Sequence, residues 1–284
     1  MIDLQDKEDL RALGDLVRDI RDQSAGADFM LVGAAARDLL LQHHHGVEPL
    51  RKTTDVDFAF AVPDWPAYIA LTKRMIDTGG FKPDDRIQHR LRNRIGTVVD
   101  LLPFGGVESP EAQIVWPPPG EALMSVIGYA EANAATESVM LPGTVPLAVI
   151  TIPMFALLKL FAWEDRHLAQ PRKDAGDLLF VLEHAFRVAG LERLHDVAPE
   201  LFDLDNFDPE LAGAWSIGFQ ARAVIDRHSQ RAQAIVTRAS MIVARETDPN
   251  GSLGLIGEVE ARDPERARRK LGAFGNGLTG VRAL

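Results

Sequence analysis

Two acidic residues stand at the start of an apolar strand-like run in "KTTDVDFAFAV", residues 52 to 62. Because side chains at i and i+2 lie on the same face of a strand, Asp55 and Asp57 should point the same way. Two carboxylates this close repel each other unless a cation neutralises them. A divalent metal such as Mg²⁺ would do so, since it takes oxygen ligands together with phosphates. The alternative is an exposed edge strand with two solvated acids.

A third acid, Asp100 in "GTVVDLLPF", is flanked on both sides by apolar residues and should lie on a core strand. If that strand neighbours the first, three carboxylates converge, which is enough to hold two metal ions along a triphosphate. We expect the charge of this cluster to be neutralised by metal only when a nucleotide arrives, which leaves the site electrostatically strained at other times. The alternative is an acid that caps a strand end.

Two further segments could bind phosphate. In "LVGAAARDLL" (31–40), Gly33 separates a strand from a helix, and free N–H groups at such a turn can hold an anion. In "FALLKLFAWEDRHL", Lys159 and Arg166 stand seven residues apart, about 10.5 Å along one helical face, and both could reach phosphate oxygens. The alternatives are a tight turn and a solvated basic stripe. The triplet "HHH" (43–45) indicates a loop or a helix end rather than a metal site.

The elements that must position these residues follow from apolar periodicity. Helices are predicted over 7–22, 34–42 and about 65–76, and the last ends at Gly79-Gly80. Strands are predicted over 27–33, 54–62, 86–93 and 95–104, with a strand–turn–strand over 138–150, and "VWPPPGE" (115–121) predicts a rigid loop. After Pro153 the patterns are helical. An α/β sheet domain of residues 1–150 followed by a helical domain of 151–284 is therefore expected.

Composition limits the partners. The 284 residues carry a net charge of −10, which argues against broad nucleic-acid binding, although "RIQHRLRNR" (86–94) and "RARRK" (266–270) could form a local basic groove. There is no cysteine, the first residues are acidic and polar, and no apolar run approaches about 20 residues. We expect a cytoplasmic protein without a membrane partner.

The ordered motifs resemble the DNA polymerase β-like nucleotidyltransferase superfamily. More narrowly, Arg51-x-Thr53-x-Asp55-x-Asp57, with "LKLFAWEDR…KDAGDL" (158–178) downstream, resembles the AbiEii/AbiGii toxin nucleotidyltransferases. This resemblance implies a nucleotidyltransferase fold of the α/β (α+β) class, with a small mixed sheet flanked by helices and a mostly helical C-terminal domain. One departure is Ala34, which replaces the Gly or Ser usual at that turn, so that only backbone N–H groups remain there.

The resemblance also implies roles for individual residues. Asp55, Asp57 and Asp100 would hold Mg²⁺ or Mn²⁺, and Asp100 would lie closest to the acceptor. The nucleoside triphosphate would contact Gly33, Ala34, Arg37 and Thr53. From the helical part, Lys159 would stabilise the leaving group, and Arg166 and Asp177 would face the triphosphate or acceptor. As a surface residue, Lys159 should have a small effect on stability when it is substituted.

The implied reaction moves a nucleoside monophosphate to an acceptor hydroxyl, with the 3′ end of tRNA as the first candidate and Arg90, Arg92, Arg94, Arg268 and Arg269 as candidates for the RNA groove. The implied setting is the toxin of a toxin–antitoxin or phage-defence pair, with a cognate antitoxin protein as partner. Three alternatives stay open: a protein Ser, Thr or Tyr acceptor, a small-molecule acceptor, and a non-catalytic nucleotide-binding subunit.

Overall fold

The computed structural model describes residues 1–24, 26–51, 53–117, 123–205, 207–251, 254–259 and 261–284. The described chain divides into two compact units, Met1–Thr151 and Ile152–Leu284. The boundary predicted at residue 150 lies next to this division. Residues 118–121 of the predicted 115–121 loop lie outside the described residues.

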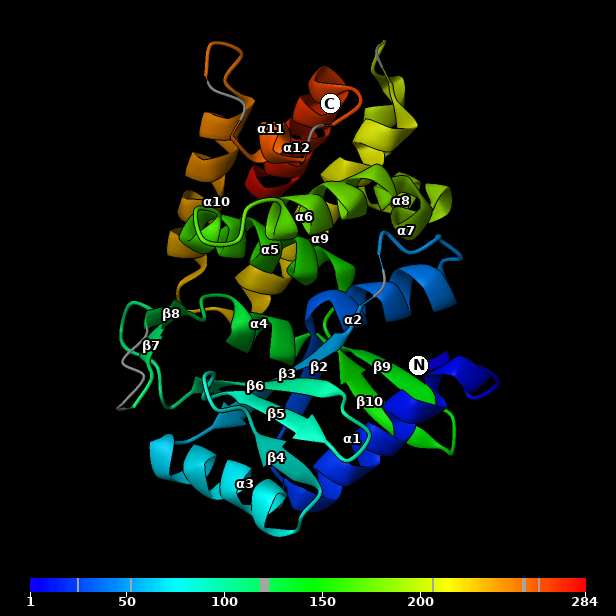
Figure 1. Cartoon of the computed structure of the whole chain (residues 1–284). Helices are drawn as coiled ribbons and strands as arrows, with labels where there is room; N and C mark the ends of the chain where they lie inside the picture. Colours follow the sequence, from blue (N-terminus) through cyan, green and yellow to red (C-terminus); the bar gives the residue numbers. More distant parts are fainter. Residues whose placement is uncertain (25, 52, 118–122, 206, 252–253, 260) are drawn as a thin grey trace. The chain divides into compact units, whose positions relative to one another are not determined.

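Eight strands of the described chain form one mixed sheet in the N-terminal unit (Figure 1). Their spatial order is β1-β9-β10-β2-β3-β6-β5-β4. The bounds are β1 (Ile2–Asp3), β2 (Phe29–Val32), β3 (Asp55–Val62), β4 (Phe81–Pro83), β5 (Arg90–Asn93), β6 (Val98–Gly105), β9 (Glu137–Leu141) and β10 (Val145–Val149). Strands β7 (Gln113–Val115) and β8 (Leu123–Ser125) form a separate antiparallel pair.

Helices cover both faces of this sheet. They are the 3₁₀-helix η1 (Glu8–Leu10), α1 (Arg11–Gln23), α2 (Gly33–Asp38), the π-helix η2 (Leu39–His44), α3 (Trp65–Asp77) and α4 (Tyr129–Ala134). Figure 1 shows α1 and α3 on one face and α2 and α4 on the other. The apolar side chains of the strands, with Phe58 and Phe60 fully buried, form the core between these layers.

Most of the predicted elements are confirmed. The predicted strands 27–33, 54–62 and 95–104 correspond to β2, β3 and β6, and the strand–turn–strand over 138–150 corresponds to β9 and β10. The predicted strand 86–93 begins later, at Arg90, because the Asp84 carboxylate accepts hydrogen bonds from the N–H groups of Arg86 and Ile87 and closes a turn there. The three histidines 43–45 lie at the end of the π-helix, as predicted.

The C-terminal unit is helical in all its described elements, as predicted. They are α5 (Ile152–Arg166), α6 (Lys173–Glu183), α7 (Ala185–Ala189), α8 (Leu191–Val197), the 3₁₀-helix η3 (Pro199–Asp203), α9 (Pro209–His228), α10 (Ala232–Thr247), α11 (Leu255–Glu258) and α12 (Pro264–Thr279).

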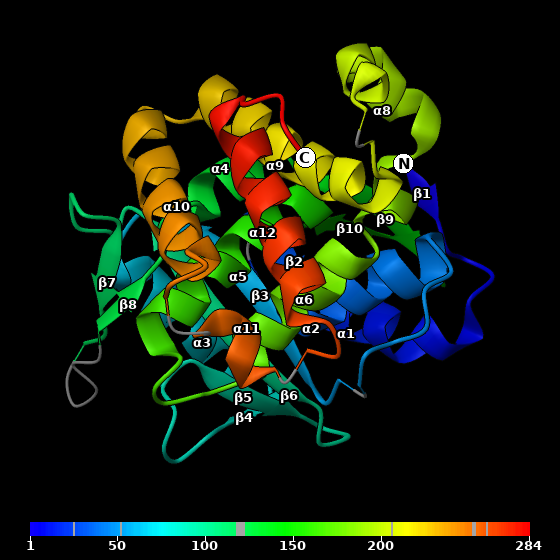
Figure 2. The ribbon, with the colours of Figure 1, turned by 90° about the horizontal axis from the view of Figure 1, so that it is seen from above.

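Helix α12 packs against α9 and α10 (Figure 2). Its approach to α9 needs glycine, since a Cβ at Gly218 would lie 2.0 Å from the Phe274 carbonyl oxygen and one at Gly277 would lie 2.0 Å from that of Trp215. The α/β class, with a mixed sheet flanked by helices and a helical C-terminal part, is therefore confirmed. None of the helices in the described ranges is both long and apolar enough to cross a membrane.

Candidate active site

The pairing of β3 with β6 brings the three predicted acids together. The two strands are parallel, and the register places Asp57 opposite Asp100, while Asp55 lies two residues earlier on the same face of β3. Each of the three side chains offers a carboxylate oxygen, and these oxygens all lie within 4.8 Å of one another. Asp100 is buried, and the other two are half-buried. The condition that the sequence left open, that the two strands are neighbours, is met.

Gly33 lies directly against this acidic cluster of Asp55, Asp57 and Asp100. Strand β2 is antiparallel to β3 with Val32 opposite Asp57, so the next residue, where α2 begins, lies beside that carboxylate. Gly33 has φ +68°, and a Cβ atom there would lie 1.9 Å from Oδ2 of Asp57. Both the left-handed backbone and the close approach therefore require glycine at this turn.

Arg90 is part of the site, although its sequence context suggested a different role. Strand β5 is antiparallel to β6 and places Arg90 opposite Asp100. The guanidinium donates from Nε to Oδ1 and from Nη2 to Oδ2 of Asp100, at 2.7 Å in both cases. This bidentate bond raises the pKa of Arg90, while burial opposes the shift and the charges of Asp100 and Asp55 add to it.

Two expectations are corrected by this contact. The cluster is not left uncompensated between catalytic events, because a resident guanidinium already neutralises part of its charge. Arg90 also points into the acidic cluster rather than lining an exposed basic groove. The signal for this contact was present in the sequence: in a hairpin with its turn at Ile95, residues equally distant from that turn pair with each other, and Arg90 and Asp100 are such a pair.

The donor set fits a hard divalent cation. Carboxylate oxygens are the ligands that Mg²⁺ and Mn²⁺ take in proteins, and three of them from two adjacent strands converge here. Both oxygens of Asp100 are engaged by Arg90, however. A metal ion on Asp100 would therefore use the remaining lone pairs of these oxygens or take the place of the guanidinium.

The other residues expected at the turn are less accessible. Ala34 and Arg37 are buried, and Arg37 is fully so. The Arg37 guanidinium donates from Nε to the Asp38 carboxylate at 2.8 Å, and the same carboxylate accepts from the hydroxyl of Thr53. Arg37 and Thr53 thus join the turn to the segment that enters β3. These bonds hold the turn against the strand, and nucleotide contact by the two side chains stays a prediction.

The residues expected from the helical unit form a buried ion network. The ammonium of Lys159 lies 2.8 Å from the Asp174 carboxylate and 2.7 Å from that of Asp177, and all three side chains are buried. The Arg166 guanidinium binds Asp174 through Nε at 2.7 Å. The expectation that Lys159 is a surface group is therefore wrong.

Asp174 is the residue of this network that sequence reasoning missed. Burial by itself raises the pKa of Asp174, but the hydrogen bond from Arg166 and the charge of Lys159 outweigh it and lower the pKa to about 2. Its spacing of three residues from Asp177 on one helix was the available signal. The ion pairs that join Lys159 and Arg166 to Asp174 and Asp177 are thus all made within the helical unit.

The two basic stretches are largely occupied by local contacts. Arg92 lies 3.6 Å from Asp84, and Arg94 donates to the Gly79 carbonyl oxygen. In the second stretch, Arg266 binds Asp208 and Glu210, and Lys270 is buried between Glu183 and Glu210. Arg268 pairs with Glu265, and Arg269 is exposed. Arg86, Arg92 and Arg94 of the first stretch are nevertheless exposed, so the RNA groove stays a prediction.

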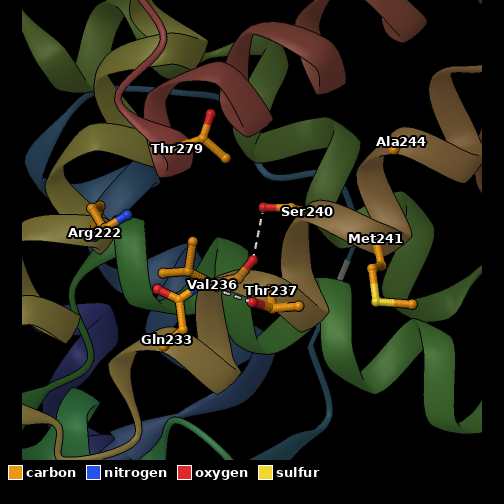
Figure 3. Close-up of a pocket in the computed structure, with 8 residues that line it drawn as sticks. All are labelled: Arg222, Gln233, Val236, Thr237, Ser240, Met241, Ala244 and Thr279. Carbon is orange, nitrogen blue, oxygen red and sulfur yellow. Dashed lines mark hydrogen bonds between the residues drawn. The ribbon is translucent and has the colours of Figure 1, made fainter.

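A pocket of about 430 Å³ lies within the helical unit, between α10 and the ends of α9 and α12 (Figure 3). Its lining includes Val236, Met241 and Thr279, and its only ionisable lining group, Arg222, is bound to Asp226. Ser240 donates to the Val236 carbonyl oxygen within the same helix. This lining offers neither an acid cluster nor a paired nucleophile and base, so the acidic cluster remains the candidate active site.

Comparison with known proteins adds little to this geometry. No protein-family model matches the chain, and no curated protein matches it. Among solved structures, the chain is similar to the solution structure of the antibiotic-resistance factor ANT(2'')-Ia, with 13% sequence identity and a TM-score of 0.40. That similarity covers 68% of this chain and 92% of the other. Similarity of this size assigns no function to the chain.

Proposed function

We propose that this chain is a metal-dependent nucleotidyltransferase, which moves a nucleoside monophosphate from a nucleoside triphosphate to an acceptor hydroxyl. The observation that supports this most strongly is the convergence of Asp55, Asp57 and Asp100 within 4.8 Å, directly beside the Gly33 turn. Arg90 offsets only part of the negative charge of three carboxylates. The divalent ions that accompany a triphosphate would supply further positive charge.

In this proposal the acceptor oxygen attacks the α-phosphorus and forms the new P–O bond. The bond from the α-phosphorus to the bridging oxygen breaks, and pyrophosphate leaves with its electron pair. The hydroxyl proton passes to a carboxylate of the acidic cluster, with Asp100 as the proposed acceptor. When bound, Mg²⁺ or Mn²⁺ on Asp55, Asp57 and Asp100 would neutralise charge that develops on the phosphate oxygens.

The neighbouring residues keep this arrangement in place. The Gly33–Ala34 backbone is the proposed phosphate contact, since the missing Cβ allows a close approach to Asp57. Arg37 and Thr53 fix the turn through Asp38. Residues 1–150 would then be the catalytic domain and residues 151–284 would contribute to acceptor binding, with Lys159, Arg166 and Asp177 shaping the helical unit rather than touching phosphate from an exposed position.

The acceptor class is the finer part of the proposal. The 3′ end of tRNA, in the setting of a toxin with a cognate antitoxin, is the acceptor that the resemblance to the toxin nucleotidyltransferases implies. The net charge of −10 limits the number of phosphate contacts that RNA binding could use. If RNA binds, the slope of log affinity against log salt should therefore be shallow, on the order of −2 to −4.

The test is transfer of label from each of the four α-labelled triphosphates, with Mg²⁺, to total cellular RNA and total cellular protein. Asp57→Asn is the matched inactive variant, because it keeps the side-chain shape and removes the charge. We expect label transfer by the parent and none by the variant. Transfer by Asp57→Asn within a few-fold of the parent would contradict the metal assignment. Label that remains in protein after RNase treatment would move the acceptor from RNA to protein.

A further inference from the structure

The acidic cluster holds its own cation. Arg90 spans both oxygens of Asp100, the most deeply buried of the three carboxylates, with two bonds of 2.7 Å. A metal ion that uses Asp100 would bind the same two oxygens, beside the positive charge of the guanidinium. The two cations repel each other at this carboxylate, so the binding of one weakens the binding of the other.

We propose that Arg90 is a resident counter-ion that competes with the divalent metal ion for Asp100, so that the metal ion binds by displacing it. This rests on the proposed function in one respect, the assignment of Asp100 as a metal ligand. Arg90 acts through Asp100 and is a positioning residue. It stabilises the cluster in the metal-free protein and weakens the binding of the metal ion.

The difference in exposure between the two side chains identifies the partner that moves. The side chain of Arg90 is 25% exposed and that of Asp100 is 8% exposed. A long, partly exposed side chain on β5 can swing its guanidinium to solvent, whereas the short Asp100 side chain is held at its place on β6. Departure of Arg90 without a replacement would leave a buried carboxylate unpaired, which is strongly unfavourable. A divalent ion supplies that replacement with a larger charge.

This exchange predicts opposite effects in the absence and presence of metal. Removal of the guanidinium should lower the stability of the metal-free protein, because Asp100 loses its partner. The same change should tighten metal binding, because the competitor is gone. If Arg90 merely supported the fold of the site, its removal would lower the stability of the metal-free protein and also weaken metal binding. The direction of the change in metal affinity therefore separates the two roles.

The experiment measures binding of Mn²⁺ alone to the full chain, from the electron paramagnetic resonance signal of free Mn²⁺, without nucleotide. Arg90→Gln removes the charge, and Arg90→Lys keeps it with a single donor group. Arg92→Gln is the matched control, since Arg92 lies two residues along the same strand and pairs with Asp84 outside the cluster. We expect Arg90→Gln to lower the Kd about tenfold, which corresponds to about 1.4 kcal/mol. Arg90→Lys should fall between it and the parent, and Arg92→Gln should equal the parent.

Unchanged or weaker Mn²⁺ binding by Arg90→Gln would overturn the proposal. If Arg90→Gln does not fold, Arg90→Lys is measured instead. A Kd of Arg90→Lys for Mn²⁺ equal to or above that of the parent would likewise overturn the proposal. A parent that binds Mn²⁺ and transfers nucleotide while Arg90→Gln changes nothing rejects this inference alone. Tighter binding by Arg90→Gln, in a protein that transfers no label, supports the competition and rejects the proposed function.

Discussion

A Cβ atom at Gly33 would lie 1.9 Å from Oδ2 of Asp57 and 2.8 Å from its Cγ. A methyl group at this turn would require the Asp57 carboxylate to shift. The first residue of α2 and the central acid of β3 are thus locked together, although 24 positions separate them in the sequence. The turn and the acidic cluster therefore form one structural unit, and a change in either should be detected in the other.

The first prediction is that Gly33→Ala destabilises the chain by about 2–4 kcal/mol, from a left-handed backbone that alanine resists and from the contact with Asp57. The free energy of unfolding in urea measures it. The matched control is Gly46→Ala, since Gly46 has φ +65° but nothing within 4 Å of its added Cβ. The control should lose only about 1 kcal/mol.

The loss of unfolding free energy should be larger for Gly33→Ala than for Gly46→Ala, and the difference measures the contact with Asp57. Combining Gly33→Ala with Asp57→Ala should recover part of the loss, because the shorter side chain leaves room for the methyl group. Equal losses for the two glycine variants would show that the carboxylate yields freely and that the close approach is not a constraint.

The second prediction concerns the charge of the cluster. Asp57→Asn should leave the melting temperature in the absence of metal equal or higher, since it removes one of three converging negative charges. Saturating Mg²⁺ should raise the melting temperature of the parent by several degrees, on the order of 5 °C, and that of Asp57→Asn by much less.

Thermal unfolding with and without Mg²⁺ checks this, and Asp77→Asn serves as the control, because Asp77 is an exposed acid at the end of α3 paired with Lys73. The control should gain as much from Mg²⁺ as the parent. The same Mg²⁺ gain in Asp57→Asn would remove Asp57 from the metal site.

The third prediction is that Lys159→Met lowers the free energy of unfolding by about 3–5 kcal/mol, because it removes the buried cation that Asp174 and Asp177 share. Methionine preserves most of the volume, so the loss reports charge rather than a cavity. Denaturant unfolding measures it against Lys73→Met, whose exposed partner is Asp77 and whose loss should stay below about 0.5 kcal/mol. A loss of similar size in both variants would return Lys159 to the surface role that its sequence suggested.

The acidic cluster could be predicted because its information is local and ordered. Asp55 and Asp57 share a strand face by spacing alone, and Asp100 stands in an apolar run that has to be a core strand. The sequence did not show that these two strands are adjacent in the sheet. The structure shows that β3 and β6 are parallel neighbours. The bond from Arg90 to Asp100 depends on the register of the β5–β6 hairpin. If the turn is placed one residue away, every cross-strand pair changes, so this contact is harder to predict.

The role of Lys159 could not be predicted in the same way. Helical spacing identifies the face that Lys159 and Arg166 share, but it does not say whether that face meets solvent or another helix. The residues around Lys159 are apolar on all sides of α5, and its partners Asp174 and Asp177 come from α6. Periodicity within one helix carries no information about a pairing between two helices, so the burial of Lys159 in an ion network could not be predicted from it.

The last prediction follows from the lowered pKa of Asp174. The carboxyl has a pKa of about 2 in the folded protein against 3.8 for its ordinary value, so the folded state binds its proton less readily than the unfolded state does. Its contribution to stability is therefore complete above about pH 4 and is lost as the pH falls toward 2, by about 2 kcal/mol in total.

Asp174→Asn removes this proton-linked contribution. The free energies of unfolding of the parent and of Asp174→Asn should differ most at neutral pH and converge as the pH approaches 2. Asp226→Asn, which loses only an exposed pairing with Arg222, should run parallel to the parent throughout. A constant gap between the parent and Asp174→Asn from pH 7 to pH 2 would mean that the ion network of the helical unit does not hold the Asp174 carboxylate in its charged form.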